Sequence, residues 1–108
     1  MPVKITYTDQ LIIDARMVVS FERQRKTVGK FSVQLEVKLR NGWHKVIRYD
    51  NAHGRAHRHI FYPDGSEFKQ DMLVTNYGMA LTASVSTVKT KHPKFIQDYC
   101  LKLNPKQL

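Results

Sequence analysis

The stretch from Phe31 to Arg40 constrains the fold more than any other part of the chain. Its apolar side chains alternate with polar ones at Phe31, Val33, Leu35, Val37 and Leu39. Period two is the pattern of a strand with one buried face. The dipeptide Asn41-Gly42 follows and favours a type I′ turn, so residues 43–50 are predicted to return as the antiparallel partner.

Three further strands are predicted around this hairpin. Apolar and polar side chains alternate at residues 3–7, 15–23 and 56–62, and the first of these runs is short. The long polar side chains at 23–26 have no core to enter, so they are predicted to form an exposed connection. Together these segments favour an antiparallel meander of four to five strands.

The last two predicted strands both carry polar side chains on their faces. Along residues 43–50 neither face is purely apolar, so one face must tolerate charge. The strand at 56–62 separates its side chains into an imidazole-bearing face and a mixed face. The two faces are His57, His59 and Phe61 on one side and Arg58, Ile60 and Tyr62 on the other.

After Phe68 the spacing of apolar residues becomes helical. The helical stripe consists of Tyr77, Leu81, Val85 and Val88. Asn76 or Thr75 is predicted to cap the first helix, and Pro93 is predicted to end it before a second helix at 95–103. Strands followed by helices indicate an α+β fold. We therefore predict one domain, residues 1–108, in which the sheet packs against one or two C-terminal helices.

The charge of the chain favours polyanionic partners. Eighteen Lys and Arg residues against nine Asp and Glu residues leave a formal net charge of +9. RNA, DNA or an acidic protein would be attracted to such a surface. No carboxylate occurs between Asp71 and Asp98, and three lysines in this interval form a second basic patch. They are Lys89, Lys91 and Lys94.

Cysteine usage and hydropathy indicate a cytoplasmic protein. Cys100 is the single cysteine, so the fold is expected to stand on packing alone in a reducing compartment. No apolar run approaches the roughly 20 residues of a membrane helix, and we expect no membrane contact. The long apolar face of residues 31–39 also favours a homodimer.

The segment from Arg48 to Gly65 holds three of the five histidines and is the candidate site. Cleaving RNA without a metal needs a general base, a general acid and cations that stabilise the phosphorane. Imidazoles titrate near neutral pH, and guanidinium groups grip phosphate oxygens in pairs. The candidate catalytic residues are His57, His59, Arg48, Tyr49 and Asp50. The candidate nucleic-acid-binding residues are His53, Arg55, Arg58 and Tyr62, with Lys89, Lys91 and Lys94.

A metal site is the rival chemistry for the same histidines. The spacing of His57 and His59 puts two imidazoles on one face of a strand, and His53 or Asp50 could complete a Zn, Ni or Mn shell. Neighbouring arginines would repel a dication, and the alternation turns Arg58 away more readily than Arg55. Of these two chemistries we therefore favour the metal-independent site, and we expect no cofactor.

Two non-catalytic interpretations also stay open. Aromatic residues interleaved with arginines could stack on bases and hold phosphates in a nucleic-acid-binding module. Trp43 belongs to this pattern, although its position beside an apolar strand favours the core. A third interpretation is a small adaptor that docks by charge on an acidic protein.

One block of sequence resembles a known family. Residues 48–52, Arg-Tyr-Asp-Asn-Ala, and the following His57-Arg58-His59 resemble the core of the TumE-type toxins of bacterial and archaeal type II toxin-antitoxin systems. The resemblance covers residues 15 to 70, and the chain lacks the longer proline-containing stretch that the family carries between the two blocks. It implies a meander sheet and a growth-inhibiting toxin neutralised by a cognate antitoxin. The implied site residues are Arg48, Tyr49, Asp50, His57 and His59.

Overall fold

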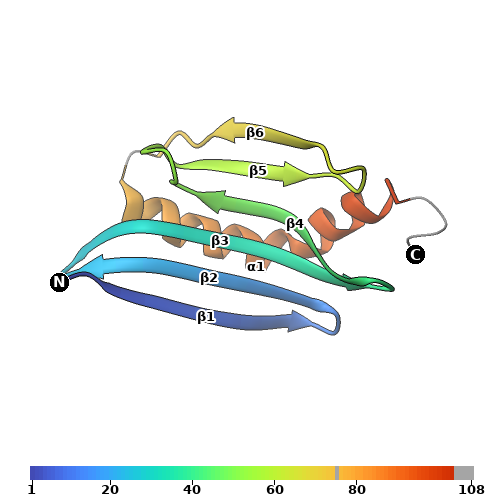
Figure 1. The fold of residues 1–108 in the computed structure, drawn as a ribbon, viewed down its shortest axis with the longest axis horizontal. Helices are drawn as coiled ribbons and strands as arrows, with labels where there is room; N and C mark the ends of the chain where they lie inside the picture. The colour runs from blue at the N-terminus through green and yellow to red at the C-terminus, as the bar shows by residue number, and fades with distance from the viewer. Residues whose placement is uncertain (75, 104–108) are drawn as a thin grey trace.

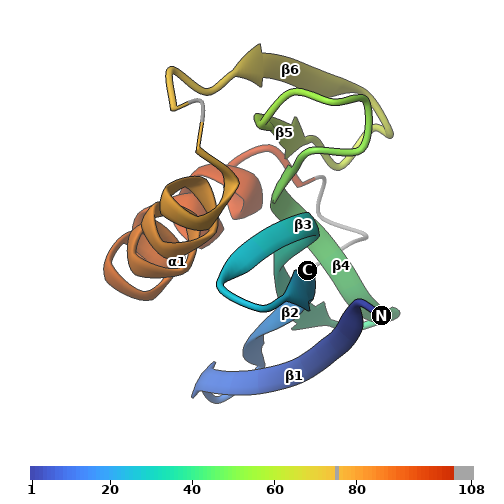
Figure 2. The same cartoon turned by 90° about the vertical axis from the view of Figure 1, so that its left-hand side faces the viewer.

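The computed structural model describes residues 1–74 and 76–103. Six antiparallel strands form one sheet in which each strand pairs with its neighbour in sequence. The strands are β1 (Val3–Ile12), β2 (Ala15–Gln24), β3 (Thr27–Leu39), β4 (Gly42–Asp50), β5 (His57–Phe61) and β6 (Glu67–Asp71). The helix α1 (Tyr77–Cys100) lies behind the sheet in Figure 1 and on one side of it in Figure 2. The α+β prediction is confirmed, with more strands than expected and one helix in the described residues.

The core lies between α1 and the centre of the sheet. Apolar side chains from β2 and β3 are fully buried there, as the alternation at Phe31–Leu39 predicts. Ala80, Ser84 and Val88 of α1 are also fully buried, and two of them are small enough to bring the helix close to β3. Each large apolar side chain buried in this way stabilises the fold by about 1.5–3 kcal/mol. The opposite face of the sheet, called here the open face, carries the polar side chains.

The β3–β4 hairpin is confirmed, but its turn is not the predicted type I′. Leu39 pairs with Gly42, so the two-residue loop is Arg40 and Asn41. Gly42 has φ of 119°, whereas neither loop residue has positive φ. A type I′ turn needs positive φ at both central residues. The residue with positive φ is therefore Gly42, which directly follows the two-residue loop, whereas a type I′ turn would place it inside the loop.

A bulge at Val46 explains why neither face of β4 is purely apolar. Ile47 pairs with Leu35, and Lys45 pairs with Glu36, which leaves Val46 as an extra residue in β4. Side chains before the bulge therefore exchange faces with those after it.

Trp43 is on the open face as a result of this bulge. The residue is 37% exposed, and the guanidinium of Arg16 lies 3.8 Å from the centroid of its ring. The predicted core position of Trp43 is therefore wrong, because a single strand register does not extend along β4.

The helix continues through Pro93, where the sequence predicts an end. Proline has no N–H to donate to the carbonyl of Lys89, one helical turn earlier. Nδ1 of His92 lies 3.0 Å from that carbonyl oxygen and takes the place of the missing donor. The predicted second helix is therefore part of α1. The predicted cap at Asn76 is confirmed, since its side chain accepts a hydrogen bond from the Met79 amide.

The edge strand β6 was not predicted. All five of its side chains are exposed, so it has no apolar alternation to detect, although its backbone pairs with β5. The predicted strand at residues 3–7 is also longer than expected, because β1 follows β2 along its whole length. Among the described residues, no helix has both the length and the apolar character needed to cross a membrane.

Candidate functional site

Asp50 is the centre of a buried polar cluster on the open face. It pairs with His57 across β4 and β5, and its Oδ1 is 2.9 Å from Nε2 of His57. Its Oδ2 is 3.4 Å from Nε2 of His59. The three residues are only 5%, 3% and 7% exposed in that order. The cluster is thus a closed site, in which two adjacent strands bring one carboxylate against two imidazoles.

The contact of His57 with Asp50 is not a hydrogen bond. Although the two atoms are 2.9 Å apart, the alignment is poor, and Nε2 of His57 has no hydrogen-bond partner in the described residues. A buried nitrogen in this state costs free energy. The hydrogen bonds among the described residues therefore leave one buried nitrogen of the cluster unsatisfied.

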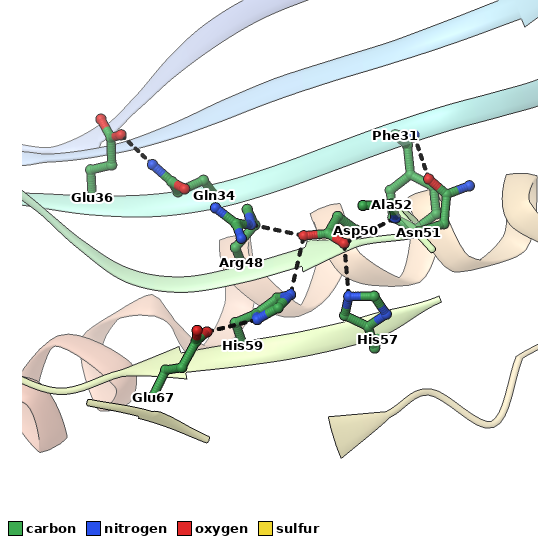
Figure 3. Close-up of polar contacts among 10 residues, drawn as sticks. All are labelled: Phe31, Gln34, Glu36, Arg48, Asp50, Asn51, Ala52, His57, His59 and Glu67. Atoms are coloured by element: carbon green, nitrogen blue, oxygen red, sulfur yellow. Dashed lines mark hydrogen bonds and ion pairs between the residues drawn. The ribbon is translucent and has the colours of Figure 1, made fainter. Parts of the chain in front are cut away.

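His59 faces a carboxylate at each of its ring nitrogens. Nδ1 lies 2.8 Å from Oε2 of Glu67, and Nε2 faces Asp50 (Figure 3). Glu67 belongs to β6, so the sequence offered no signal for its role. Its carboxylate reaches His59 because Glu67 pairs with Phe61, two residues along β5.

Arg48 and the Ala52 amide hold the Asp50 carboxylate in place. Nε of Arg48 donates to Oδ2 at 2.8 Å, and the Ala52 amide donates to Oδ1 at 3.2 Å. Burial acts to raise the pKa of Asp50, but the hydrogen bonds from these two donors and the positive charge of Arg48 outweigh it and hold the pKa below its usual range. The hydrogen bond from His59 similarly lowers the pKa of Glu67. Both carboxylates are therefore anionic at neutral pH.

A row of rings covers the cluster along β5. His53 stacks on His57 with ring centroids 6.3 Å apart, and Phe61 stacks on His59 at 6.0 Å. His57 and His59 meet edge to face at 4.7 Å. Lys45 then lies over Phe61, 4.4 Å from its centroid. These flanking rings and cations account for the burial of imidazoles on a face that α1 does not cover.

Tyr49 does not join this cluster. It points to the face packed by α1, pairs with Val33 and is buried in the core. Alternation along β4 separates it from Arg48 and Asp50. The next residue, Asn51, has a structural role, because its Oδ1 accepts from the Phe31 amide and its Nδ2 donates to the Gly29 carbonyl.

Three of the candidate nucleic-acid-binding residues meet at a hollow between α1 and the end of β5. Arg58, Tyr62 and Lys94 line a cavity of about 240 Å³ together with Lys102, which the sequence analysis did not single out. Asp98 also lines it and lies 3.8 Å from Lys94. We call this cavity the Tyr62 hollow.

A second hollow adjoins the first on the open face. It has a volume of about 530 Å³, and Trp43, Lys45 and Glu67 line it. Phe61 and Tyr62 line both hollows. We call it the Trp43 hollow.

The remaining candidate binding residues lie apart from both hollows. Arg55 forms an exposed ion pair with Asp71 at 3.1 Å, and Nζ of Lys89 is 3.8 Å from Asp9. Lys91 is exposed on α1, and His53 is exposed at the end of the ring row. The predicted site thus divides into a buried cluster, two adjoining hollows and scattered surface cations.

Residues 1–105 match the profile of a family described as a domain of unknown function, DUF7718. The chain belongs to the DUF7718 family. No curated protein and no solved structure matches the chain. The function of the chain is therefore inferred from the geometry of its buried cluster and its two hollows.

Proposed function

We propose that the protein binds single-stranded RNA across the Tyr62 and Trp43 hollows. The observation that carries this proposal is the meeting of Arg58, Lys94 and Lys102 at one hollow that also contains Tyr62. Three cations around an aromatic ring are the usual elements of a site that holds phosphates and stacks bases. The net charge of +9 adds long-range attraction to the same ligand.

The two hollows together offer a path for more than one nucleotide. Tyr62 stands between them, with Nζ of Lys102 5.1 Å from its ring centroid on one side. Beyond it, Lys45 and the exposed ring of Trp43 continue the alternation of cation and aromatic ring. A strand of RNA placed along this path would lay phosphates on the lysines and bases on the rings.

Binding is better supported than metal-free cleavage. A histidine that acts as general base must reach the 2′-hydroxyl of RNA with a ring nitrogen. Both nitrogens of His59 face carboxylates, and the His57 side chain is 4% exposed. The endoribonuclease hypothesis therefore requires these side chains to rearrange, whereas the hollows are accessible as they stand.

The resemblance to TumE-type toxins supports a cellular role for RNA binding. In this proposal the protein inhibits growth by sequestering RNA, and a cognate antitoxin covers the hollows. A homodimer would form through an edge of the sheet, which is β1 or β6 in the described residues. The apolar face of β3 is not available for this purpose, because β3 is central in the sheet and packs against α1.

Fluorescence anisotropy with a labelled 12-nucleotide RNA tests the proposal. The double variant Lys94→Ala, Lys102→Ala removes two phosphate contacts at the Tyr62 hollow. Each contact to a single strand contributes about 0.7 to the slope of log affinity against log salt, so near 0.1 M salt the loss is roughly 10- to 30-fold. The slope itself should fall by about 1.4.

The matched control is Lys26→Ala, Lys30→Ala. It removes the same charge from exposed positions near the β2–β3 turn, at the other end of the molecule from the C-terminal end of α1 (Figure 1). The proposal predicts that this control changes affinity less than threefold. Equal losses in the two variants would show that binding follows net charge alone and would contradict the proposed site. A DNA strand of the same sequence measures the preference for RNA.

A further inference from the structure

The buried cluster has the ligand types and spacing of a transition-metal site. One ligand atom from each of Asp50, His57 and His59 lies within 4.8 Å of the others. Zinc binds imidazole nitrogen and carboxylate oxygen at about 2.0–2.2 Å, so two ligands at one ion stand roughly 2.9–3.5 Å apart. The Asp50 oxygens are 2.9 Å and 3.4 Å from the two Nε2 atoms. We propose that Asp50, His57 and His59 bind one divalent ion of the zinc class.

The unpartnered nitrogen of His57 points independently to an ion. Nε2 is buried, faces Asp50 Oδ1 and has no hydrogen-bond partner among the described residues. A lone pair aimed at a carboxylate is unfavourable unless a proton or a cation lies between them. The poor alignment for a hydrogen bond leaves a cation, bound off the line between the two atoms, as the group that satisfies both.

The neighbours of the ligands are arranged as a supporting shell. A metal-bound histidine commonly donates its other N–H to a carboxylate, which fixes the ring and its tautomer. Glu67 accepts from Nδ1 of His59 at 2.8 Å, so the lone pair of His59 lies on Nε2, facing Asp50. Arg48 and the Ala52 amide hold the Asp50 carboxylate in the same way.

Two of the three nearby arginines are turned away from the cluster. Arg58 lies on the opposite face of β5, and its Nε donates to Gln70. Arg55 is exposed and paired with Asp71. Arg48 is the cation in contact with Asp50, and Nε binds the single oxygen Oδ2. The repulsion expected from Arg55 and Arg58 is therefore small.

The ligand set selects the class of ion. Two imidazoles and one carboxylate suit zinc, and the Irving–Williams order places copper and nickel among the competing ions. Magnesium and calcium prefer oxygen ligands and are expected to bind weakly. Three protein ligands leave a position for water, as in catalytic zinc sites. The inference does not depend on RNA binding, because the three ligands lie outside the residues proposed to hold phosphates.

Isothermal titration of the chain 1–108, stripped with EDTA and titrated with Zn²⁺, tests the site. The expected result is one ion per chain with micromolar or tighter affinity. Co²⁺ in place of zinc should give visible absorption bands of a site with nitrogen and oxygen ligands. Binding of Mg²⁺ in preference to Zn²⁺, or no saturable binding of Zn²⁺ at micromolar concentration, would overturn the proposal.

Variants separate this site from adventitious binding by surface histidines. His57→Ala and His59→Ala should each lower affinity by roughly 100-fold or more, and Glu67→Gln by about 10- to 100-fold. His92→Ala is the control, since His92 lies on α1, away from the cluster. Unchanged affinity in His57→Ala, or equal loss in His92→Ala, would contradict the assignment.

A measurement on the unaltered chain covers the case in which these variants fail to fold. Zinc should shift the ¹⁵N resonances of Nε2 in His57 and His59 and leave those of His44 and His92 in place. Shifts at all five histidines, or more than one ion per chain, would indicate surface chelation and overturn the proposal.

Discussion

Asp50 and His57 lie directly opposite each other on β4 and β5, with Oδ1 and Nε2 2.9 Å apart in a closed site. Asp50 is the carboxylate that the cluster shares, since it also contacts His59 and Arg48. The strand register therefore makes this one residue decisive for both the stability and the chemistry of the open face.

The first prediction concerns the loss of this charge. Asp50→Asn removes the anion that compensates Arg48, and breaking a buried pair in this way costs about 3 kcal/mol. Urea denaturation in EDTA measures the change in the free energy of unfolding. Asp98→Asn is the control, because its exposed pair with Lys94 is worth less than about 1 kcal/mol. Equal effects of the two substitutions would contradict the central role of Asp50.

The second prediction concerns Asn51, which ties the end of β4 to the start of β3. Asn51→Ala leaves the Phe31 amide and the Gly29 carbonyl without their side-chain partners. An unsatisfied buried amide costs about 1–3 kcal/mol. Hydrogen exchange should show faster exchange at the Phe31 amide than in the unaltered chain. Unchanged protection at that amide would show that Asn51 is not its partner in solution.

The third prediction concerns the Lys89 carbonyl in α1, which accepts from the His92 side chain because Pro93 has no backbone N–H. His92→Ala removes the group that faces the Lys89 carbonyl and should destabilise the chain by about 1 kcal/mol. Pro93→Ala restores the backbone donor and should stabilise it. In the Pro93→Ala background His92→Ala should therefore have little effect. A double-mutant cycle with zero coupling would contradict this compensation.

The fourth prediction concerns alkaline pH. Burial raises the pKa of Tyr99 above its usual value of about 10, with a smaller contribution from Cys100, and burial also raises the pKa of the Cys100 thiol. The folded state then binds more protons than the unfolded state at high pH, so stability falls as pH rises. The loss should begin near pH 9 and continue above pH 10. Tyr99→Phe should weaken this dependence, and an identical slope in the variant would contradict it.

Much of the sheet could be predicted because one face of each inner strand is apolar. The alternation at Phe31–Leu39 and the Asn41-Gly42 signal locate the central hairpin, and the same alternation assigns His57 and His59 to one face of β5. By contrast all five side chains of β6 are exposed, which leaves no apolar alternation in the sequence. The role of Glu67 could not be foreseen for the same reason.

Other errors arose from single residues whose effect depends on the rest of the fold. The bulge at Val46 moves Trp43 to the open face, which no local pattern reveals. Proline usually ends a helix, but a side chain of the preceding residue replaces the donor that Pro93 lacks, so the local sequence predicts an end that α1 does not have. The Tyr62 hollow joins β5 to the end of α1, so Lys102 could be assigned to it only from the tertiary structure.

The most direct test of the proposed function is a ¹H–¹⁵N NMR titration of the chain with a short single-stranded RNA. The account predicts shifts at Trp43, Lys45 and Tyr62 and in the last turns of α1, around Lys94. It predicts no shifts at the β2–β3 turn, although Lys26 there is also exposed and positive. Shifts confined to that turn, or spread over every basic residue, would contradict an RNA site at the two hollows.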